Sequence, residues 1–464
     1  MLAQPSLESL IPSMPTLAPS PTRTMADWVV RSQWSDIEAT AKAVASRSLV
    51  NWLGCVLGGA SDPAVDQLLA AVQQLGSSGK SPLSGRAEST DPGTSALVHA
   101  FASNILDYDD THWATAIHPA GIVASALAAL VGHAKMSGED FLHAFLLGTE
   151  VECRIGMAVS PGHYEQGWHI TATCGVFGAA VAAGRIMGLS SQQMAWAMGH
   201  AATQSSGLVA SLGSMAKSLN IGHAARNGLL AAQWARYGIT ANDQALEARF
   251  GFADVMGSRP LDPLLCERLG HHWEAERNTF KPYPCGFLLH PAVDACLASP
   301  DRWTVDEETI DHVLVVVHPL AQVRADRPHP VNGLESKLSL QHAVAVALLQ
   351  GEAGVRAFSD ASVNDPNVQA LRSRVRVVSD EKLTAQDACL ELHLCSGQRL
   401  SREIRATSGR APATMSDAVL ERKFCDLVAY GTPHCDAPQL LDALQRFPQA
   451  EDAADLFRLT VRRP

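Results

Sequence analysis

The sequence predicts a mainly α protein with a smaller α+β domain, and three changes along the chain carry this prediction. Residues 25–270 are rich in Ala, and their apolar residues recur at intervals of three and four, as on one face of a helix. Residues 271–402 contain β-branched runs that are typical of strands. Residues 403–464 return to helical spacing, so we expect them to pack on the first domain. A chain of 464 residues has room for two or three domains.

The N-terminal part is predicted to be a flexible tail followed by the helical domain. Residues 1–24 contain five prolines and one arginine, which fits neither a signal peptide nor an Arg-rich transit peptide. In the helical domain, Leu97, Phe101 and Ile105 share one face. Ser190 is a candidate cap for the next amphipathic helix.

The second domain is predicted from three strand-like runs and one helix. Thr309–Ala321 and Ser373–Asp380 are β-branched, and Cys389–Gly397 alternates apolar and polar residues. Between them, Lys337–Gly351 has the spacing of an amphipathic helix. Strands combined with a few helices make a small α+β domain.

The bulk composition excludes several classes of protein. With 47% hydrophobic and 18% charged residues, the chain is globular. A net charge of -11 without a Lys/Arg-rich block predicts no nucleic-acid partner and no anionic membrane partner. No apolar run suits a transmembrane helix. Ten cysteines without a CxxC pair indicate reduced thiols, and we expect a cytoplasmic protein.

The first polar cluster is Asn104–Gly121, NILDYDDTHWATAIHPAG. If the preceding helix continues through it, Asp107, Asp110 and Thr111 share one face, and His118 follows a short turn. An Asp beside a His suits general acid–base catalysis, although the same residues also suit a polar helix end. A divalent metal site is a third interpretation. The sequence has no HExxH motif and no EF-hand loop, so we expect no metal.

Two further clusters combine a histidine with cations. His169 precedes a Gly/Ala-rich helix, and a helix N-terminus disfavours imidazolium, which suits a neutral imidazole beside a carboxylate substrate. Lys217 is expected in a loop of small residues between two apolar helices, and Arg226 on the second helix. Lysine and arginine both suit carboxylate binding. A capped surface histidine and a solvated lysine are the alternatives.

The fourth cluster, Phe280–Leu297, lies at the predicted domain junction, where ligand sites often occur. Lys281 is its second residue, Pro282 and Pro284 stiffen it, and Gly286 permits an unusual turn. Cys285 is a candidate acid or base, or else a small buried residue. The sequence has no Rossmann, Walker A or nucleophile-elbow motif, so we expect no organic cofactor.

These clusters, in this order, resemble the MmgE/PrpD family, which includes 2-methylcitrate dehydratase, cis-aconitate decarboxylase and iminodisuccinate epimerase. The matching segments are LDYDDTHWATAIHPAG, GTEVECRIG, GWHITATCGVFGAA, GSMAKSLNIGHAARNGLLAA, KPYPCGFLLHPAVDA and ESKLSLQHAVAVAL. The resemblance runs from about Met25 to the C-terminus. It implies a large all-helical domain, an α+β lid inserted before the last helices, and a homodimer. It also implies an active site between the domains that needs no metal or cofactor.

The resemblance also implies site residues. The residues that correspond to the site of the decarboxylase branch are Asp107, Thr111, His118, His169 and Lys217. One position departs, because that branch has a further histidine where this sequence has Gly286, beside Cys285. The departure favours an epimerase of the iminodisuccinate type. The alternatives are a lyase, dehydratase or decarboxylase, on a 2-methylcitrate- or cis-aconitate-like acid, and an inactive helical dimer module.

The family activities share one chemical problem, which is to move a proton next to a carboxylate on a small di- or tricarboxylic acid. An ionised carboxylate stabilises a neighbouring carbanion poorly, so the pocket must hold cations and donors against it. We expect Lys217, with Arg226 or Lys281, to neutralise substrate carboxylates. Thr111 is expected to donate a hydrogen bond to the substrate, and Cys285 to contact it.

The two histidines carry the expected proton transfer. His118 and His169 are the proton-transfer pair, and Asp107 orients or tunes one of their imidazoles. Together with Lys217 they form the predicted catalytic set.

Overall fold

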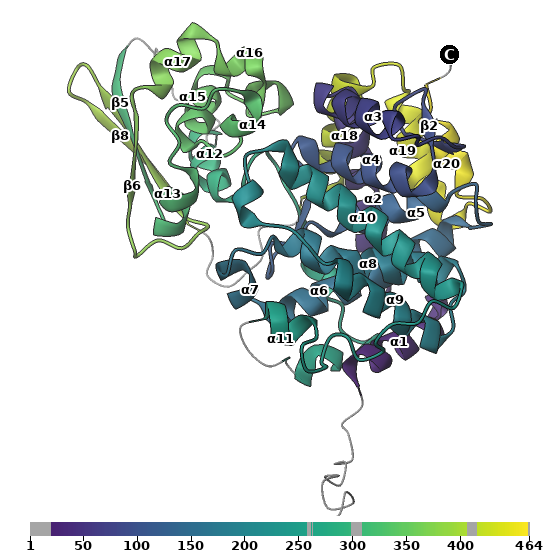
Figure 1. Ribbon diagram of the computed structural model, residues 1–464. Helices are drawn as coiled ribbons and strands as arrows, with labels where there is room; N and C mark the ends of the chain where they lie inside the picture. Colours follow the sequence, from purple (N-terminus) through teal and green to yellow (C-terminus); the bar gives the residue numbers. More distant parts are fainter. Residues whose placement is uncertain (1–19, 258–260, 262, 298–308, 406–414, 463–464) are drawn as a thin grey trace, which may run out of the picture.

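The chain folds into a large helical body and a smaller body that contains a sheet (Figure 1). The computed structural model describes residues 20–257, 261, 263–297, 309–405 and 415–462. The fold class predicted from the sequence, mainly α with a smaller α+β domain, is confirmed. Of the predicted tail, residues 1–19 lie outside the described residues. Ser20 caps a helix that begins at Pro21, so the next residues are helical.

The large body combines helices from both ends of the chain. Its helices are α1 (Pro21–Arg31), α2 (Ala39–Gly59), α3 (Pro63–Gln74), α4 (Pro92–Ile105), α5 (Pro119–Leu130), α6 (Gly138–Val159), α7 (Gly162–Glu165), α8 (Ile170–Ile186), α9 (Ser191–Gln204), α10 (Met215–Arg236), α11 (Phe252–Met256), α18 (Asp417–Gly431), α19 (Ala437–Arg446) and α20 (Ala454–Arg458). In Figure 1 the C-terminal helices lie beside α2 and α3, and Phe424 of α18 shares the core that contains Trp52 of α2. Among the described helices, none has the length and apolar character needed to cross a bilayer.

Local sequence signals begin several of these helices. Ser137 and Ser190 each form a capping box with the residue three positions later, at the starts of α6 and α9. The cap predicted at Ser190 is therefore confirmed. Asp91 accepts a hydrogen bond from the backbone N–H of Thr94 at the start of α4. Proline follows in the first turn, where its missing N–H costs nothing.

Glycine allows the central helices α6 and α8 to pack closely. A Cβ built on Gly148 would lie 2.6 Å from the carbonyl oxygen of Gly178, and one on Gly178 would lie 2.9 Å from that of Gly148. Any side chain at these positions would push the helices apart. This contact fixes α8 in the core, with its N-terminus at the pocket described below.

The smaller body, called the lid here (residues 285–404), has its own core. Its four-stranded sheet has the order β6-β5-β7-β8, in which β5 pairs parallel with β6 and antiparallel with β7. Val313 and Val315 of β5 and Leu390 and Leu392 of β7 are buried against the lid helices. The elements are α12 (His290–Leu297), β5 (Ile310–Val317), α13 (Pro319–Ala325), α14 (Gly333–Ser336), α15 (Leu340–Gln350), α16 (Asp360–Val363), α17 (Pro366–Arg372), β6 (Val375–Ser379), β7 (Ala388–Leu394) and β8 (Arg399–Ile404).

The first lid strand is shorter than the sequence pattern predicts. The β5 strand ends at Val317 instead of continuing to Ala321. Pro319 occupies the first turn of α13, and the side chain of His318 accepts a hydrogen bond from the backbone N–H of Leu320. Proline cannot donate to a strand ladder but suits a helix start, so the chain turns into a helix at this point.

The junction between the bodies also differs in detail from the predicted boundary at residue 271. Strand β4 (Asn278–Phe280) pairs antiparallel with β3 (Asp110–His112) of the large body. The apolar core of the lid starts at Cys285. The segment just before the lid therefore lies against the first polar cluster.

Candidate active site

The first polar cluster is a turn and a strand, not a helix. Helix α4 ends at Ile105, and Asp107 has a φ of 53°, in the left-handed region that Asp tolerates better than most residues. The expectation that Asp107, Asp110 and Thr111 share a helix face is therefore wrong. Strand β3 follows the turn, and Asp107 is the residue that reaches the pocket.

A pocket of about 680 Å³ lies between the helical body and the lid. Five residues predicted for the site line it: Asp107, His118, His169, Lys217 and Lys281. The lid contributes the segment around Gly286 and Phe287 and two arginines, Arg324 and Arg327. Residues that are far apart in the sequence therefore form one cavity.

An ion-pair cluster of Asp107, Lys217 and Lys281, called the Asp107 cluster here, forms one side of the pocket. The Oδ1 atom of Asp107 lies 2.5 Å from Nζ of Lys217 and 3.0 Å from Nζ of Lys281. Burial alone would raise the pKa of the Asp107 carboxyl, but the two lysines outweigh it and hold the pKa well below its usual value. Burial would lower the pKa of Lys281, but Asp107 and Asp109 raise it. The two ammonium groups exceed the Asp107 carboxylate by one positive charge, and the Asp109 carboxylate beside Lys281 offsets it.

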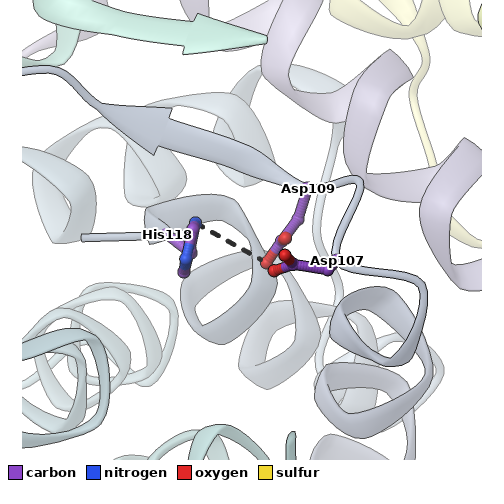
Figure 2. Close-up of side chains that lie close together, drawn as sticks. All are labelled: Asp107, Asp109 and His118. Carbon is purple, nitrogen blue, oxygen red and sulfur yellow. Dashed lines mark ion pairs between the residues drawn. The ribbon is translucent and has the colours of Figure 1, made fainter. Parts of the chain in front are cut away.

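Figure 2 shows Asp107, Asp109 and His118 grouped together, with His118 Nδ1 4.0 Å from Oδ2 of Asp109. Ligand atoms of these three residues all lie within 4.8 Å of one another, so the group has the spacing of a cation site. These carboxylates already form ion pairs with lysine ammonium groups, because Lys281 also lies 3.8 Å from Oδ1 of Asp109. The arrangement fits an ion-pair cluster better than a metal site.

His118 is held in one orientation by the backbone of β3. It is the N-cap of α5, and its Nδ1 lies 2.7 Å from the carbonyl oxygen of Asp110 and 3.2 Å from Oγ1 of Thr111. A carbonyl can only accept, so Nδ1 carries the proton and Nε2 of the neutral ring is free to accept one. Burial lowers the pKa of His118 to about 4, aided by Lys281 and Lys217 and opposed by Asp109.

His169 is the second imidazole of the pocket. It is the N-cap of α8, as the sequence predicted, and its backbone N–H donates to the carbonyl of Gly207. Burial lowers the pKa of its imidazole to about 3, and Lys217 adds to the effect. In the part of the chain that the structure describes, its Nδ1 has no hydrogen-bond partner. Both histidines are therefore neutral at pH 7 before a ligand enters.

Comparison with known families accounts for nearly the whole chain. Residues 23–263 match the MmgE/PrpD N-terminal domain, and residues 283–446 match the MmgE/PrpD C-terminal domain. The chain belongs to the MmgE/PrpD family. The stretch between the two matches contains β4, the strand that connects the helical body to the lid.

Among characterised MmgE/PrpD proteins, the chain is similar to several cis-aconitate decarboxylases. It is 31% identical to the one from Homo sapiens over 62% of this chain and 61% of that protein. It is 30% identical to that of Mus musculus over 62% and 60%, so these matches span less than two thirds of either mammalian relative. The likeness to the protein of Aspergillus terreus is 24% identity, over 94% of this chain and 95% of that protein.

Three residues predicted for the MmgE/PrpD site do not line this pocket. Thr111 touches His118 but faces a neighbouring cavity of about 670 Å³. Cys285 is fully buried in the lid core, and burial raises the pKa of its thiol well above the usual value. Arg226 lies near the start of α4, where a Cβ built on Gly93 would be 3.7 Å from its Nε atom.

Arg226 lies outside the pocket because of its position on α10. Lys217 stands in the first turn of this helix, not in a loop, so both cations belong to one helix. Positions 217 and 226 are separated by about 180° around a helix axis at 3.6 residues per turn. Only Lys217 can therefore face the pocket.

Sequence reasoning also missed cations that the structure brings to the site. Lys423 of α18 is buried, and its Nζ donates to Asn51 Oδ1 and to the carbonyls of Tyr108 and Lys281 at 2.7, 2.7 and 2.9 Å. Lys337 of the lid donates to the carbonyl of Ile105 at 2.8 Å. Both lysines occur in ordinary helical patterns, so no local signal distinguishes them from solvated lysines.

Proposed function

We propose that the chain is a lyase that removes CO₂ from a cis-aconitate-like tricarboxylic acid. The observation that carries the proposal is the pocket itself, in which two neutral imidazoles lie beside paired lysines. The likeness to cis-aconitate decarboxylases over most of the chain supports the same reaction. It favours the lyase that the sequence left as an alternative, and it gives no support to the epimerase.

The reaction needs a cation and an acid. When the allylic carboxylate of such an acid leaves as CO₂, its bonding electrons shift through the double bond to the carbon next to a remaining carboxylate. That carbon must then take up one proton, and the product has one carboxylate less. Positive charge against the remaining carboxylate lowers the barrier, because it opposes the charge that builds there.

The pocket residues have separate roles in this reaction. Lys217 and Lys281 receive a substrate carboxylate, and the ion pairs with Asp107 hold both lysines in place. Binding a polyanion raises the pKa of His118, since added negative charge favours imidazolium. His118 then takes up a proton at Nε2 and delivers it to the carbanion, while its Nδ1–H stays on the Asp110 carbonyl. His169 orients the substrate from the start of α8.

The departure at Gly286 is compatible with this chemistry. Gly286 lines the pocket with ordinary extended backbone, at a φ of -56°. A Cβ there would lie 3.2 Å from Cδ2 of Leu338, so a larger side chain would press on the lid. The protonation step needs only one acid, and His118 and His169 supply two imidazoles.

The decisive experiment is incubation in D₂O with cis-aconitate, 2-methylcitrate and iminodisuccinate, followed by NMR and CO₂ measurement. We expect CO₂ release from cis-aconitate and one deuterium in the product. His118→Gln should lower turnover by about 100-fold or more while the protein stays folded. Exchange of iminodisuccinate without CO₂ release would identify an epimerase, and no reaction with any of the three would reject a catalytic role on these acids.

A further inference from the structure

Both bodies contribute cations to the lining of the pocket. On the helical body, the ammonium groups of Lys217 and Lys281 in the Asp107 cluster line the cavity. On the lid, Arg324 of α13 and Arg327 just beyond it line the same cavity. Figure 1 shows α13 at the end of the lid nearest α7. We call Arg324 and Arg327 the lid arginines.

The lid arginines lie close to residues of the helical body. The guanidinium carbon of Arg324 lies 5.7 Å from the ring centroid of Tyr164 in α7. A Cβ built on Gly213 would lie 3.0 Å from Nη1 of Arg327, so this side chain lies against the turn that leads into α10. Since α10 carries Lys217, the two groups of cations approach the cavity from different bodies.

The lid arginines also lack acidic partners. Among the described residues, neither forms an ion pair with a carboxylate. The carboxylates that line the pocket are those of Asp107 and Glu165, and Asp107 is already paired with lysines. An arginine that faces a cavity without an acidic partner is suited to bind an anion, because its planar fork matches a carboxylate with two hydrogen bonds.

We infer that the lid arginines bind the substrate carboxylate farthest from the Asp107 cluster and so select acids with a carboxylate at each end. One carboxylate binds the ammonium groups of the Asp107 cluster, and a second binds the lid arginines. A monocarboxylate can satisfy only one side. The inference deepens the proposed function and rests on it for the identity of the natural substrate, but the binding preference can be measured without turnover.

The test uses the full-length protein and tricarballylate, a saturated tricarboxylate with no double bond through which CO₂ could leave. Calorimetry or NMR titration compares it with butyrate, which has a single carboxylate. We expect Arg324→Gln/Arg327→Gln to weaken tricarballylate binding by about tenfold to a hundredfold, since charged hydrogen bonds are lost. Butyrate binding should change by less than about threefold, because butyrate does not need the lid side.

Matched variants distinguish carboxylate binding by the lid arginines from a structural role of these side chains. Arg376→Gln removes an exposed arginine from β6 and should leave tricarballylate binding unchanged. Arg324→Lys/Arg327→Lys keeps the charge and should retain more affinity than the Gln pair. If Glu165→Gln weakens binding as much as the arginine changes do, the arginines hold the lid through Glu165 and the inference is wrong. Unchanged tricarballylate binding in the Gln pair would also overturn it.

Kinetics then connect the inference to the reaction. If cis-aconitate is decarboxylated, the Gln pair should raise KM by about tenfold or more and change kcat by only a few fold, because the lid arginines bind and do not transfer a proton. A loss confined to kcat would contradict the inference. If cis-aconitate is not turned over but tricarballylate binding still depends on the lid arginines, the proposed function fails and the inference stands.

Discussion

Nζ of Lys217 lies 2.5 Å from Oδ1 of Asp107, although 110 residues separate the two in the sequence. Asp107 stands in a left-handed turn after α4, and Lys217 lies in the first turn of α10. Their pairing, shared with Lys281, holds two ammonium groups in fixed positions at the pocket. Stability and activity should both depend on this contact.

Replacing Asp107 with Asn should destabilise the protein. Two ammonium groups would then face each other across a buried neutral amide, and removing one partner of a buried ion pair costs about 3–5 kcal/mol. Urea denaturation measures the change. Tricarballylate should restore part of the lost stability, because its carboxylate replaces the missing charge. A loss below about 1 kcal/mol would show that the Asp107 cluster contributes little to stability.

The catalytic efficiency should fall as the pH rises. The pKa of His118 in the free protein is about 4, so above this value the ring is neutral and must take up a proton to act as the acid. Because the protonated fraction falls tenfold per pH unit, log kcat/KM should decline with a slope near -1 from about pH 6.5 to 8.5. Tricarballylate binding in buffers of different ionisation enthalpy should show proton uptake. A flat profile with no proton uptake would exclude His118 as the proton donor.

Lys423→Met should impair activity through the backbone that carries the site. Lys423 donates to the carbonyls of Tyr108 and Lys281, the neighbours of the Asp107 cluster, and its Nζ lies 3.8 Å from the ring centroid of Tyr108. Loss of these bonds should cost about 2–4 kcal/mol, since buried acceptors are left without partners. Denaturation and kcat/KM measure the effect, and Lys382→Met, at an exposed lid lysine, is the control. If kcat/KM of the folded variant equals that of the wild type, Lys423 does not position the site.

Glu152→Gln should stabilise the protein at neutral pH. Glu152 is fully buried in α6, both carboxyl oxygens lack partners among the described residues, and burial raises its pKa well above 4.5. Above pH 4.5 the unfolded chain ionises this group while the folded chain keeps it protonated, so the folded state is increasingly disfavoured as pH rises. The amide removes this penalty, and the stability gain over wild type should grow from pH 4.5 upward.

Denaturation of Glu152→Gln and wild type between pH 4.5 and 8 provides the measurement. Glu352→Gln, at an exposed glutamate, should show no pH-dependent difference from wild type. If the difference between Glu152→Gln and wild type stays constant across this range, Glu152 is ionised in the folded protein.

The sequence alone predicted several residues that line the pocket because helix starts have local signals. His118 and His169 each stand just before an Ala/Gly-rich helix, and both were found from that pattern and from the resemblance. Helical periodicity failed at Asp107, where the chain leaves α4 in a left-handed turn. The prediction also failed for Arg226. Lys217 was expected in a loop before the helix that carries Arg226, whereas both residues lie on α10. Two residues that lie nine positions apart on one helix point in opposite directions, so they cannot both face one pocket.

The fold class and the identities of the titratable residues follow from the sequence by itself, because periodicity and composition are local properties. Which cations share a cavity was decided only by the tertiary structure. Arg324 and Lys423 have no distinguishing neighbours in the chain, and they gain a role because the lid and α18 bring them to Asp107 and its turn. Electrostatic interactions depend on distance through space and on burial, and neither is encoded at a single position of the sequence.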